Sequence, residues 1–378
     1  MNRPISVLHV VSVDKENYYL NNLVDNSLRD EVDYSFVTFA AECEFGRSLE
    51  KRGQRVYYLD SSGRREYPGA FKKLWTILKR EDPDIVHTHL FDASVIALTA
   101  AKWQKRKTVL TRHHSDAIHQ IAAPTKRKFY LALENYISQR SDHIIAPSRM
   151  VRDFLVEKEE VSSEKVSIIP YGQTTDRFDA ITPEKIANVR AELKMNCTLA
   201  LVCVSRLFHR KGHGYLFDAL AGVAASGVSY TLYLVGDGDY GNVLYQKAKA
   251  LGIADRVRFL GWRDDALAIM AAADIIVHPS LEDALSSAVI EAVMLEKPIV
   301  ATDISGVRDS LDEGKYGEIV PPADVVGFRQ GLERVIENID AARTRARDGR
   351  KYLLEYMDAG RVSAAHVEIY RGLTKSGK

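Results

Sequence analysis

Short apolar runs alternate with longer segments of helical periodicity along almost the whole chain. The runs are rich in β-branched and aromatic residues, which is typical of buried strands. In the first half they lie at 5–11, 34–39, 56–59, 85–87, 108–111, 143–146 and 166–169, and in the second half at 199–205, 230–235, 257–260, 275–277, 299–301 and 318–320. Repeated strand–helix–strand order predicts parallel sheets with helices on both faces.

The alternation is interrupted once, near the middle of the chain. After Pro170, Tyr171 and Gly172 a polar stretch runs to Phe178, and a new alternation begins at 199. A chain of 378 residues also exceeds what one hydrophobic core normally serves. We therefore expect two α/β domains, 1–172 and 173–357, whose sheets meet at a cleft near the carboxyl ends of their strands.

Composition and cysteine usage place the protein among cytosolic globular proteins. Hydrophobic residues make up 46% and charged residues 27% of the chain. The three cysteines, Cys43, Cys197 and Cys203, show no paired metal-ligand spacing, which favours a reduced compartment. No stretch has the length needed to span a bilayer, and the apolar start at 5–13 suits a buried strand better than a signal peptide. We expect a cytoplasmic protein.

Charge is unevenly distributed although the net charge is only +1. Between Arg47 and Arg152 there are 21 Lys and Arg against 10 Asp and Glu, and the basic run 126–128 leads directly into an apolar segment. This pattern predicts a basic amphipathic helix. It is either a core-facing helix with a solvated end or a patch that contacts an anionic membrane or an acidic acceptor. Nucleic acid is not expected as a partner, because no recognised binding motif accompanies the charge.

The most informative stretch is 282–291. Asp283 and Glu291 flank the small residues Ser286 and Ser287, directly after the strand at 275–277. The pattern predicts a helix N-terminus, whose unpaired N–H groups and dipole suit a phosphate. The two carboxylates would accept hydrogen bonds from sugar or ribose hydroxyls. The alternative is a plain helix cap, with Asp283 before the helix and Glu291 on its surface.

Three loops after neighbouring strands carry further binding candidates. Arg206 and Lys211 follow the strand at 199–205, where two cations suit a diphosphate, although either could be a solvated surface residue. Gly236 follows the strand at 230–235 and provides a tight turn for close backbone approach. The segment Gly261, Trp262 and Arg263 follows the strand at 257–260, where exposed backbone could pair with a nucleobase edge.

In order and spacing these motifs resemble those of glycosyltransferase family 4. The family consists of retaining enzymes with the GT-B fold, in which two Rossmann-like domains face each other across a cleft. The motifs are Ser205-Arg206-Leu207 with Lys211-Gly212, then Leu234-Val235-Gly236-Asp237-Gly238, then Phe259-Leu260-Gly261, then the spaced acids before Ala292. The junction 168–172 with Arg177 and Phe178 is similar to the family's linker, and the ending with Tyr370 is similar to its terminal helix.

The resemblance implies a role for each matching residue. Arg206 and Lys211 would neutralise the donor diphosphate, and Glu291 would bind the ribose. Asp283 stands where the family usually has a glutamate that holds a donor-sugar hydroxyl, and Glu282 lies one residue earlier. This position departs from the family pattern.

The resemblance also implies the reaction and the division of labour between domains. A sugar would move from a nucleotide-sugar donor, most often UDP-linked, to a hydroxyl of a glycan or lipid-linked acceptor. No metal is expected, because two cations would neutralise the diphosphate. Domain 1–172 would take the acceptor and domain 173–357 the donor, with the last helix, about 358–378, packing back on the first.

The first half matches the family less closely. Its early loop, 11–17, has no glycine, whereas the family's loop is commonly glycine-rich. The spaced histidines of 84–89 and the Thr-x-His turn at 111–113 resemble family motifs, so His113 would contact the donor sugar or the leaving phosphate. His114 is the alternative counterpart, and either His87 or His113 could instead be satisfied by neighbouring backbone. Ser148 and Arg149 would open a helix toward the cleft or only cap it.

Two other functions remain open at the level of sequence. One is a nucleotide-sugar epimerase of the same fold. The other is a nucleotide-sugar-binding protein without transfer activity, which the aspartate at 283 and the glycine-poor loop at 11–17 make conceivable.

Overall fold

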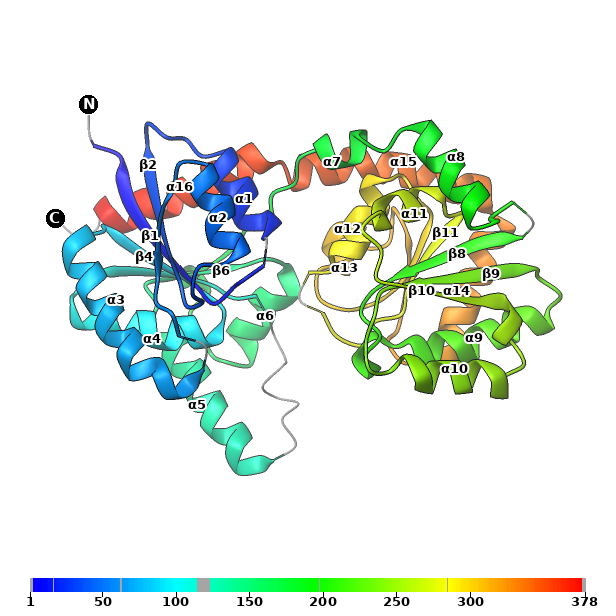
Figure 1. Ribbon diagram of the computed structural model, residues 1–378, viewed down its shortest axis with the longest axis horizontal. Coiled ribbons are helices and arrows are strands. Elements are labelled where there is room, and N and C mark those ends of the chain that lie inside the picture. Colours follow the sequence, from blue (N-terminus) through cyan, green and yellow to red (C-terminus); the bar gives the residue numbers. More distant parts are fainter. Residues whose placement is uncertain are drawn as a thin grey trace. The chain divides into compact units, whose positions relative to one another are not determined.

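The chain forms two compact α/β units, as the sequence predicts. The computed structural model describes residues 3–15, 17–61, 63–113, 123–196, 198–283 and 285–375. The first unit comprises Met1–Gln173 and Met357–Lys378, and the second comprises Thr174–Tyr356 (Figure 1). Within the described residues, no helix is both long enough and apolar enough to cross a membrane.

The described residues of the first unit form a seven-stranded parallel sheet in the order β3-β2-β1-β4-β5-β6-β7. The strands are β1 Ile5–Val11, β2 Val32–Thr38, β3 Arg55–Tyr58, β4 Ile85–His89, β5 Lys107–Thr111, β6 His143–Ala146 and β7 Val166–Ile168. The helices are α1 Tyr18–Asp25, α2 Glu44–Lys51, α3 Tyr67–Glu81, α4 Phe91–Trp103, α5 Pro124–Arg140, α6 Arg149–Glu157 and α16 Ala359–Lys375. All seven predicted strands are present, with ends shifted by at most a few residues.

Both faces of this sheet are buried, which explains why its strands read as continuous apolar runs. On β1, Val7 and Val11 pack into the cluster that contains residues of α1, α2 and α16. Leu8 and Val10 point to the opposite face and pack against α3 and α4. The two-residue period of the strand therefore divides one apolar run between two cores.

The described residues of the second unit form a six-stranded parallel sheet in the order β10-β9-β8-β11-β12-β13. The strands are β8 Leu199–Val204, β9 Tyr230–Val235, β10 Val257–Gly261, β11 Ile275–His278, β12 Ile299–Thr302 and β13 Glu318–Val320. The helices are α7 Asp176–Asp179, α8 Pro183–Glu192, α9 His213–Ala225, α10 Gly241–Ala250, α11 Ala266–Ala272, α12 Ser287–Met294, α13 Val307–Ser310, α14 Val325–Glu337 and α15 Ile339–Tyr356. Cys203 lies in the core of this unit, and burial raises the pKa of its thiol to about 12.

Strand order fixes where a ligand can bind in each unit. The chain winds outward from β1 through β2 to β3, then returns to β4 beside β1 and winds the other way. In the second unit the same reversal separates β8 from β11. At such a reversal the loops after the two central strands diverge and leave a crevice at their carboxyl ends. We call these places the switch points of the two units.

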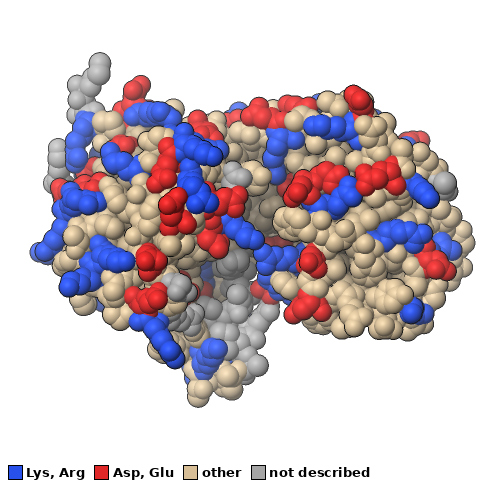
Figure 2. Space-filling view, viewed as in Figure 1, with Lys and Arg blue, Asp and Glu red and all other residues tan. Residues whose placement is uncertain are grey.

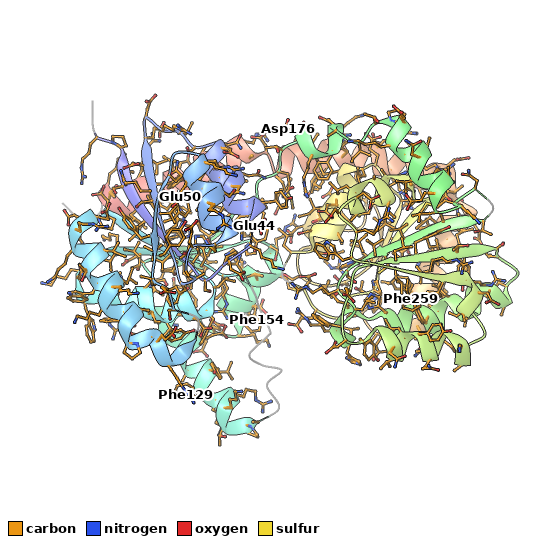
Figure 3. The ribbon with its side chains drawn as sticks, in the orientation of Figure 1. Glu44, Glu50, Phe129, Phe154, Asp176 and Phe259 are labelled. Atoms are coloured by element: carbon orange, nitrogen blue, oxygen red, sulfur yellow. The ribbon has the colours of Figure 1, made fainter. Side chains whose placement is uncertain are left out.

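The predicted basic segment is a helix of two different halves. Lys126 and Lys128, near the start of α5, are exposed, and Phe129 is 62% exposed (Figure 3). Ile137, near its end, is buried in the core below β6. The helix therefore combines a core-facing end with an exposed basic and aromatic end.

Candidate functional site

The switch point of the second unit brings together the loops after β8 and β11. Lys211 ends a short 3₁₀ turn after β8, and its Nζ donates a hydrogen bond of 2.7 Å to Oδ2 of Asp283 after β11. The side chains of Lys211 and Asp283 are 12% and 26% exposed. Glu282 instead contributes its backbone carbonyl, which accepts from Ser280 Oγ. Of the two candidate acids, Asp283 is the one that faces the predicted diphosphate-binding cation.

Two glycines allow these loops to approach each other. A Cβ atom on Gly212 would lie 1.8 Å from the carbonyl oxygen of Pro279, and one on Gly236 would lie 2.1 Å from that of Ser205. Both also have positive φ, +69° and +134°, which favours glycine. The close backbone approach predicted at Gly236 is therefore an approach to the loop that begins at Ser205.

Glu291 and Asp283 do not form the plain cap that was the alternative interpretation. The N-cap of α12 is Ser286, without a side-chain cap bond, and Ser287 is exposed at the first turn. Glu291 is not on the helix surface, because its side chain is only 16% exposed and accepts a 2.9 Å hydrogen bond from Arg177 Nη1. Burial raises the pKa of Glu291, and the Arg177 guanidinium opposes that rise.

Arg206 remains available as a cation. Its side chain is exposed, and its guanidinium carbon lies 5.8 Å from the centroid of the Phe208 ring. Among the described residues no carboxylate pairs with Arg206. The loop after β8 thus supplies one cation held by Asp283 and one that is open to an anionic ligand.

The loop after β10 is more constrained than the sequence suggests. The carbonyl oxygen of Gly261 accepts a hydrogen bond from the Gly236 N–H at 2.8 Å, so this backbone is already partly used. Trp262 is 74% exposed. Arg263 is not a free cation, since Asp265 and Glu192 pair with it at 2.7 and 2.9 Å and raise the pKa of its guanidinium. A ligand that contacts the Arg263 side chain would have to compete with these two carboxylates.

Sequence reasoning missed His278 and His213 at the same switch point. His278, the last residue of β11, is buried with an unpartnered Nε2 among the described residues. Burial lowers its pKa to about 4, although Asp283 opposes this. His213 opens α9, lies 3.0 Å from Ser205 Oγ through Nε2, and also has a pKa lowered by burial to about 4. The sequence could have pointed to both residues, because one directly follows a predicted strand and the other begins a predicted helix at the same edge of the sheet.

At the switch point of the first unit, histidines form a hydrogen-bonded chain. His9 Nδ1 on β1 lies 2.9 Å from His89 Nε2 on β4, and His89 Nδ1 lies 3.2 Å from His113 Nε2 after β5. His113 Nδ1 is in turn 2.6 Å from the Tyr171 hydroxyl. Burial lowers the pKa of His9 to about 3 and that of His89 well below its usual range. His9 and His89 are therefore neutral at physiological pH.

This arrangement bears on the role predicted for His113. Both of its ring nitrogens are engaged inside the first unit, so a bound ligand would have to replace Tyr171 or His89 as a partner. His87 is satisfied by side chains, with Tyr370 and Thr111 hydroxyls 2.7 Å from its two nitrogens. His114 lies outside the described residues. Ser148 caps α6 by accepting from the Val151 N–H, which is the capping role considered for it.

His9, His87 and His89 also form a group whose nitrogens lie within 4.8 Å of one another. Such a group can hold a metal ion in principle. Here the nitrogens of His87 and His89 and Nδ1 of His9 already have hydrogen-bond partners, and His9 Nε2 has none in the part of the chain that the structure describes. The geometry fits a hydrogen-bonded chain better than a preformed metal centre.

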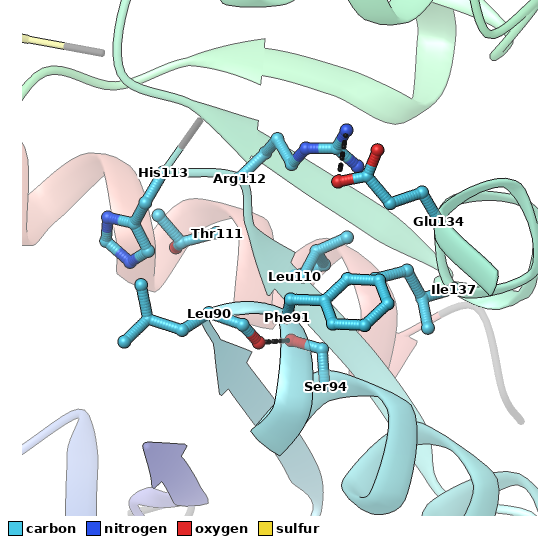
Figure 4. A pocket seen from close by; sticks show the side chains of 9 residues that line it. All are labelled: Leu90, Phe91, Ser94, Leu110, Thr111, Arg112, His113, Glu134 and Ile137. Carbon is cyan, nitrogen blue, oxygen red and sulfur yellow. Dashed lines mark hydrogen bonds and ion pairs between the residues drawn. The ribbon is translucent and has the colours of Figure 1, made fainter. Parts of the chain in front are cut away.

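Beside His113 lies a small hollow with about 300 Å³ of empty space (Figure 4). Apolar side chains of β4–α4 and α5 line it, together with Arg112 and Glu134. Arg112 pairs with Glu134 at 2.9 Å and with Glu159 at 2.6 Å. Burial raises the pKa of Glu134 to about 7, and its Oε2 has no partner among the described residues. No local sequence pattern predicts this group, because its members come from three separate segments.

Comparison with known proteins identifies the family. Residues 17–177 match Glycosyltransferase Family 4, and residues 198–338 match Glycosyl transferases group 1. The chain is 26% identical to an Escherichia coli UDP-Gal:alpha-D-GlcNAc-diphosphoundecaprenol alpha-1,3-galactosyltransferase, over 70% of this chain and 69% of that protein. It is 25% identical to a Mycobacterium tuberculosis glycogen synthase, over 76% and 68% of the two chains.

Solved structures show the same fold. Anabaena HepE, crystallised with UDP, superimposes with a TM-score of 0.82 at 21% identity, covering 97% of this chain and all of HepE. HepE has also been solved with UDP-glucose. Each of the two parallel-sheet units is matched by one of the two glycosyltransferase models, over residues 17–177 and 198–338. The protein therefore belongs to glycosyltransferase family 4 and has the GT-B fold.

Proposed function

We propose that this protein is a retaining glycosyltransferase that transfers the sugar of a UDP-sugar donor to a hydroxyl of a lipid-linked or glycan acceptor. The observation that carries the proposal is the second unit's switch point, where Lys211 pairs with Asp283, Arg206 is exposed in the same loop as Lys211, and α12 begins shortly after Asp283. Cations and helix N–H groups in a strand-end crevice are what a diphosphate requires. The UDP complexes of HepE support UDP as the donor nucleotide.

The proposed roles follow from the contacts. Lys211 and Arg206 stabilise the negative charge that grows on the leaving diphosphate, together with N–H groups near Ser287. Asp283 orients the Lys211 ammonium and accepts a hydrogen bond from a hydroxyl of the donor sugar. Glu291, held in place by Arg177, accepts a hydrogen bond from a ribose hydroxyl. Two positive charges serve the diphosphate, so the proposed reaction needs no metal ion.

The step itself is a displacement at the anomeric carbon. The acceptor oxygen forms a bond to that carbon while the bond to the diphosphate oxygen breaks, and the acceptor proton passes to the departing diphosphate. Attack on the face that the diphosphate leaves retains the anomeric configuration. Such a step depends on positioning and charge stabilisation rather than on a protein nucleophile.

The first unit is the proposed acceptor side. Its switch point carries His113 and the hollow with Glu134, whose pKa near 7 lets it accept or donate a hydrogen bond to a hydroxyl. The E. coli relative is named for a diphosphoundecaprenol-linked acceptor, which supports a lipid-linked acceptor for this chain. Such an acceptor would bring the protein to the cytoplasmic face of a membrane.

Nucleotide titration tests the donor assignment. We expect calorimetry to give the tightest binding for UDP, with GDP and ADP weaker, and Lys211→Ala to weaken UDP binding at least tenfold. Lys315→Ala, which changes an exposed lysine of the same unit, should leave binding unchanged. Equal affinity for all three nucleotides would contradict the UDP assignment.

Product analysis tests the reaction. With an active acceptor, proton NMR should show the donor's anomeric configuration in the product. An altered free sugar without any acceptor would instead indicate an epimerase, and UDP-sugar binding without turnover across a broad acceptor panel would indicate a binding protein.

A further inference from the structure

The outer surface of α3 and α4 carries a cluster of three aromatic rings. Phe71 and Trp75 lie on α3, and Trp103 ends α4. The ring centroids are 6.0 Å apart for Phe71–Trp75, 5.7 Å for Phe71–Trp103 and 6.3 Å for Trp75–Trp103. Trp103 is 68% exposed, although large rings are normally covered in soluble proteins. We call Phe71, Trp75 and Trp103 the aromatic cluster.

Three exposed lysines lie close in sequence to the members of the aromatic cluster. Lys72 and Lys79 lie on α3, and Lys105 follows α4. Lys79 Nζ lies 5.5 Å from the centroid of the Trp75 ring. Across the described part of the chain, no carboxylate lies within ion-pair distance of Lys72, Lys79 or Lys105. Figure 2 shows Lys and Arg side chains gathered over the surface where Figure 1 places α3.

The acids that end α3 or contact α4 do not cancel this charge. Each is paired with a different basic residue, and the pairs are Asp82–Arg106, Glu81–Arg80 and Asp142–Lys102. The charges of Lys72, Lys79 and Lys105 therefore remain uncompensated beside the aromatic cluster. The exposed Trp103 and these lysines, which have no carboxylate partner among the described residues, thus bring an apolar group and positive charge to neighbouring segments of the surface.

We propose that the aromatic cluster and these three lysines dock the first unit on an anionic lipid bilayer. Tryptophan prefers the headgroup level of a membrane, where its ring is buried and its N–H stays hydrated. Lysines beside it are attracted by anionic headgroups. The surface lies on the outside of helices that cover the sheet, so docking there leaves the strand ends uncovered. This inference goes beyond transfer activity, because docking requires neither donor nor acceptor.

Vesicle sedimentation tests the inference with the full chain. We expect binding to vesicles of phosphatidylglycerol and phosphatidylcholine, little binding to phosphatidylcholine alone, and loss of binding at high salt. Trp103→Ser should weaken binding about tenfold or more, as expected for a buried aromatic ring. Replacing Lys72, Lys79 and Lys105 with Gln should weaken it about 100-fold, at roughly fivefold per lysine. Val326→Ser, an exposed apolar position of the second unit, is the matched control.

Three results would overturn the proposal. The first is equal binding to anionic and neutral vesicles, or to neither. The second is unchanged binding by both the Trp103 variant and the lysine variant. The third is loss of binding in Phe129→Ser alone, which would place the docking surface on α5. Donor turnover with a water-soluble acceptor should be the same in Trp103→Ser and the unmodified chain, which separates failure of docking from failure of the proposed reaction and also reports a misfolded variant.

Discussion

At the scale of single residues, the candidate donor site depends on two carboxylates with different partners. Asp283 holds the Lys211 ammonium, and Glu291 is buried against Arg177. A buried carboxylate is stable only while its charge is compensated. Asp283 thus belongs to the candidate donor site through Lys211, and we expect Glu291 to contribute also to the stability of the second unit.

The pairing of Asp283 with Lys211 predicts unequal effects at two adjacent acids. Asp283→Asn should lower donor turnover at least 100-fold, because it removes both the partner of Lys211 and an acceptor for a sugar hydroxyl. Glu282→Gln should change turnover less than threefold. Steady-state kinetics on both variants measures the difference, and a larger loss for Glu282→Gln would assign the first acid to position 282.

The pairing of Glu291 with Arg177 predicts a stability effect. Arg177→Met leaves Glu291 buried without a partner and should lower the free energy of unfolding by about 3–5 kcal/mol. Arg308→Met, at an exposed pair with Asp303, should cost less than about 1 kcal/mol. Urea unfolding compares them. Equal, small losses for the two variants would show that Glu291 does not depend on Arg177.

At the scale of elements, α16 is held in the first unit by hydrogen bonds to residues that are far away in the sequence. Tyr370 contacts His87 on β4, and His366 Nε2 lies 2.9 Å from the Tyr19 hydroxyl on α1. All of these side chains are buried, so each depends on its partner.

Tyr370→Phe isolates one of these contacts. It should lower the free energy of unfolding by about 1–3 kcal/mol, because His87 Nδ1 is then buried without a partner. Tyr245→Phe, which removes an exposed hydroxyl, should have almost no effect. Thermal unfolding of both variants measures this, and identical stabilities would mean that the hydroxyl of Tyr370 does not stabilise the fold.

Strand positions, the second unit's loops and the helix start at Ser287 were predictable, because they follow from local periodicity and turn residues. Partners were not. Arg177 is 114 positions from Glu291, and Tyr171 is 58 from His113. Nothing local in the sequence encodes such pairs. For the same reason the pairing of Arg263 with Glu192, 71 positions away, was not predicted.

At the scale of the whole molecule, buried histidines make stability depend on pH. His9, His87, His89 and His366 lie in the first unit, and burial lowers the pKa of each, to about 3 for His9 and about 4 for His366. In the unfolded chain their pKa returns to about 6.5. The unfolded state therefore binds more protons below pH 6.5. Stability is full above that pH and falls as the pH drops toward 4.

Acid unfolding should consequently be steep. Each of these histidines contributes about 1.4 kcal/mol per pH unit, so the four together give roughly 5 kcal/mol per pH unit below pH 6. Urea midpoints at pH 8.5, 7.5 and 5.5 should be nearly equal for the first two and clearly lower at 5.5. His87→Gln should flatten the dependence, whereas His209→Gln, at an exposed position, should not. Equal midpoints at pH 7.5 and 5.5 would show that these histidines are not buried neutral.

We propose that this chain transfers a sugar from a nucleotide diphosphate at the second unit's switch point. The decisive measurement is turnover of a UDP-sugar by the unmodified chain, Lys211→Ala and Glu291→Ala. We expect both substitutions to reduce turnover at least 100-fold while the folded structure persists in the Lys211 variant. Unchanged donor turnover in both variants would show that this switch point is not the donor site.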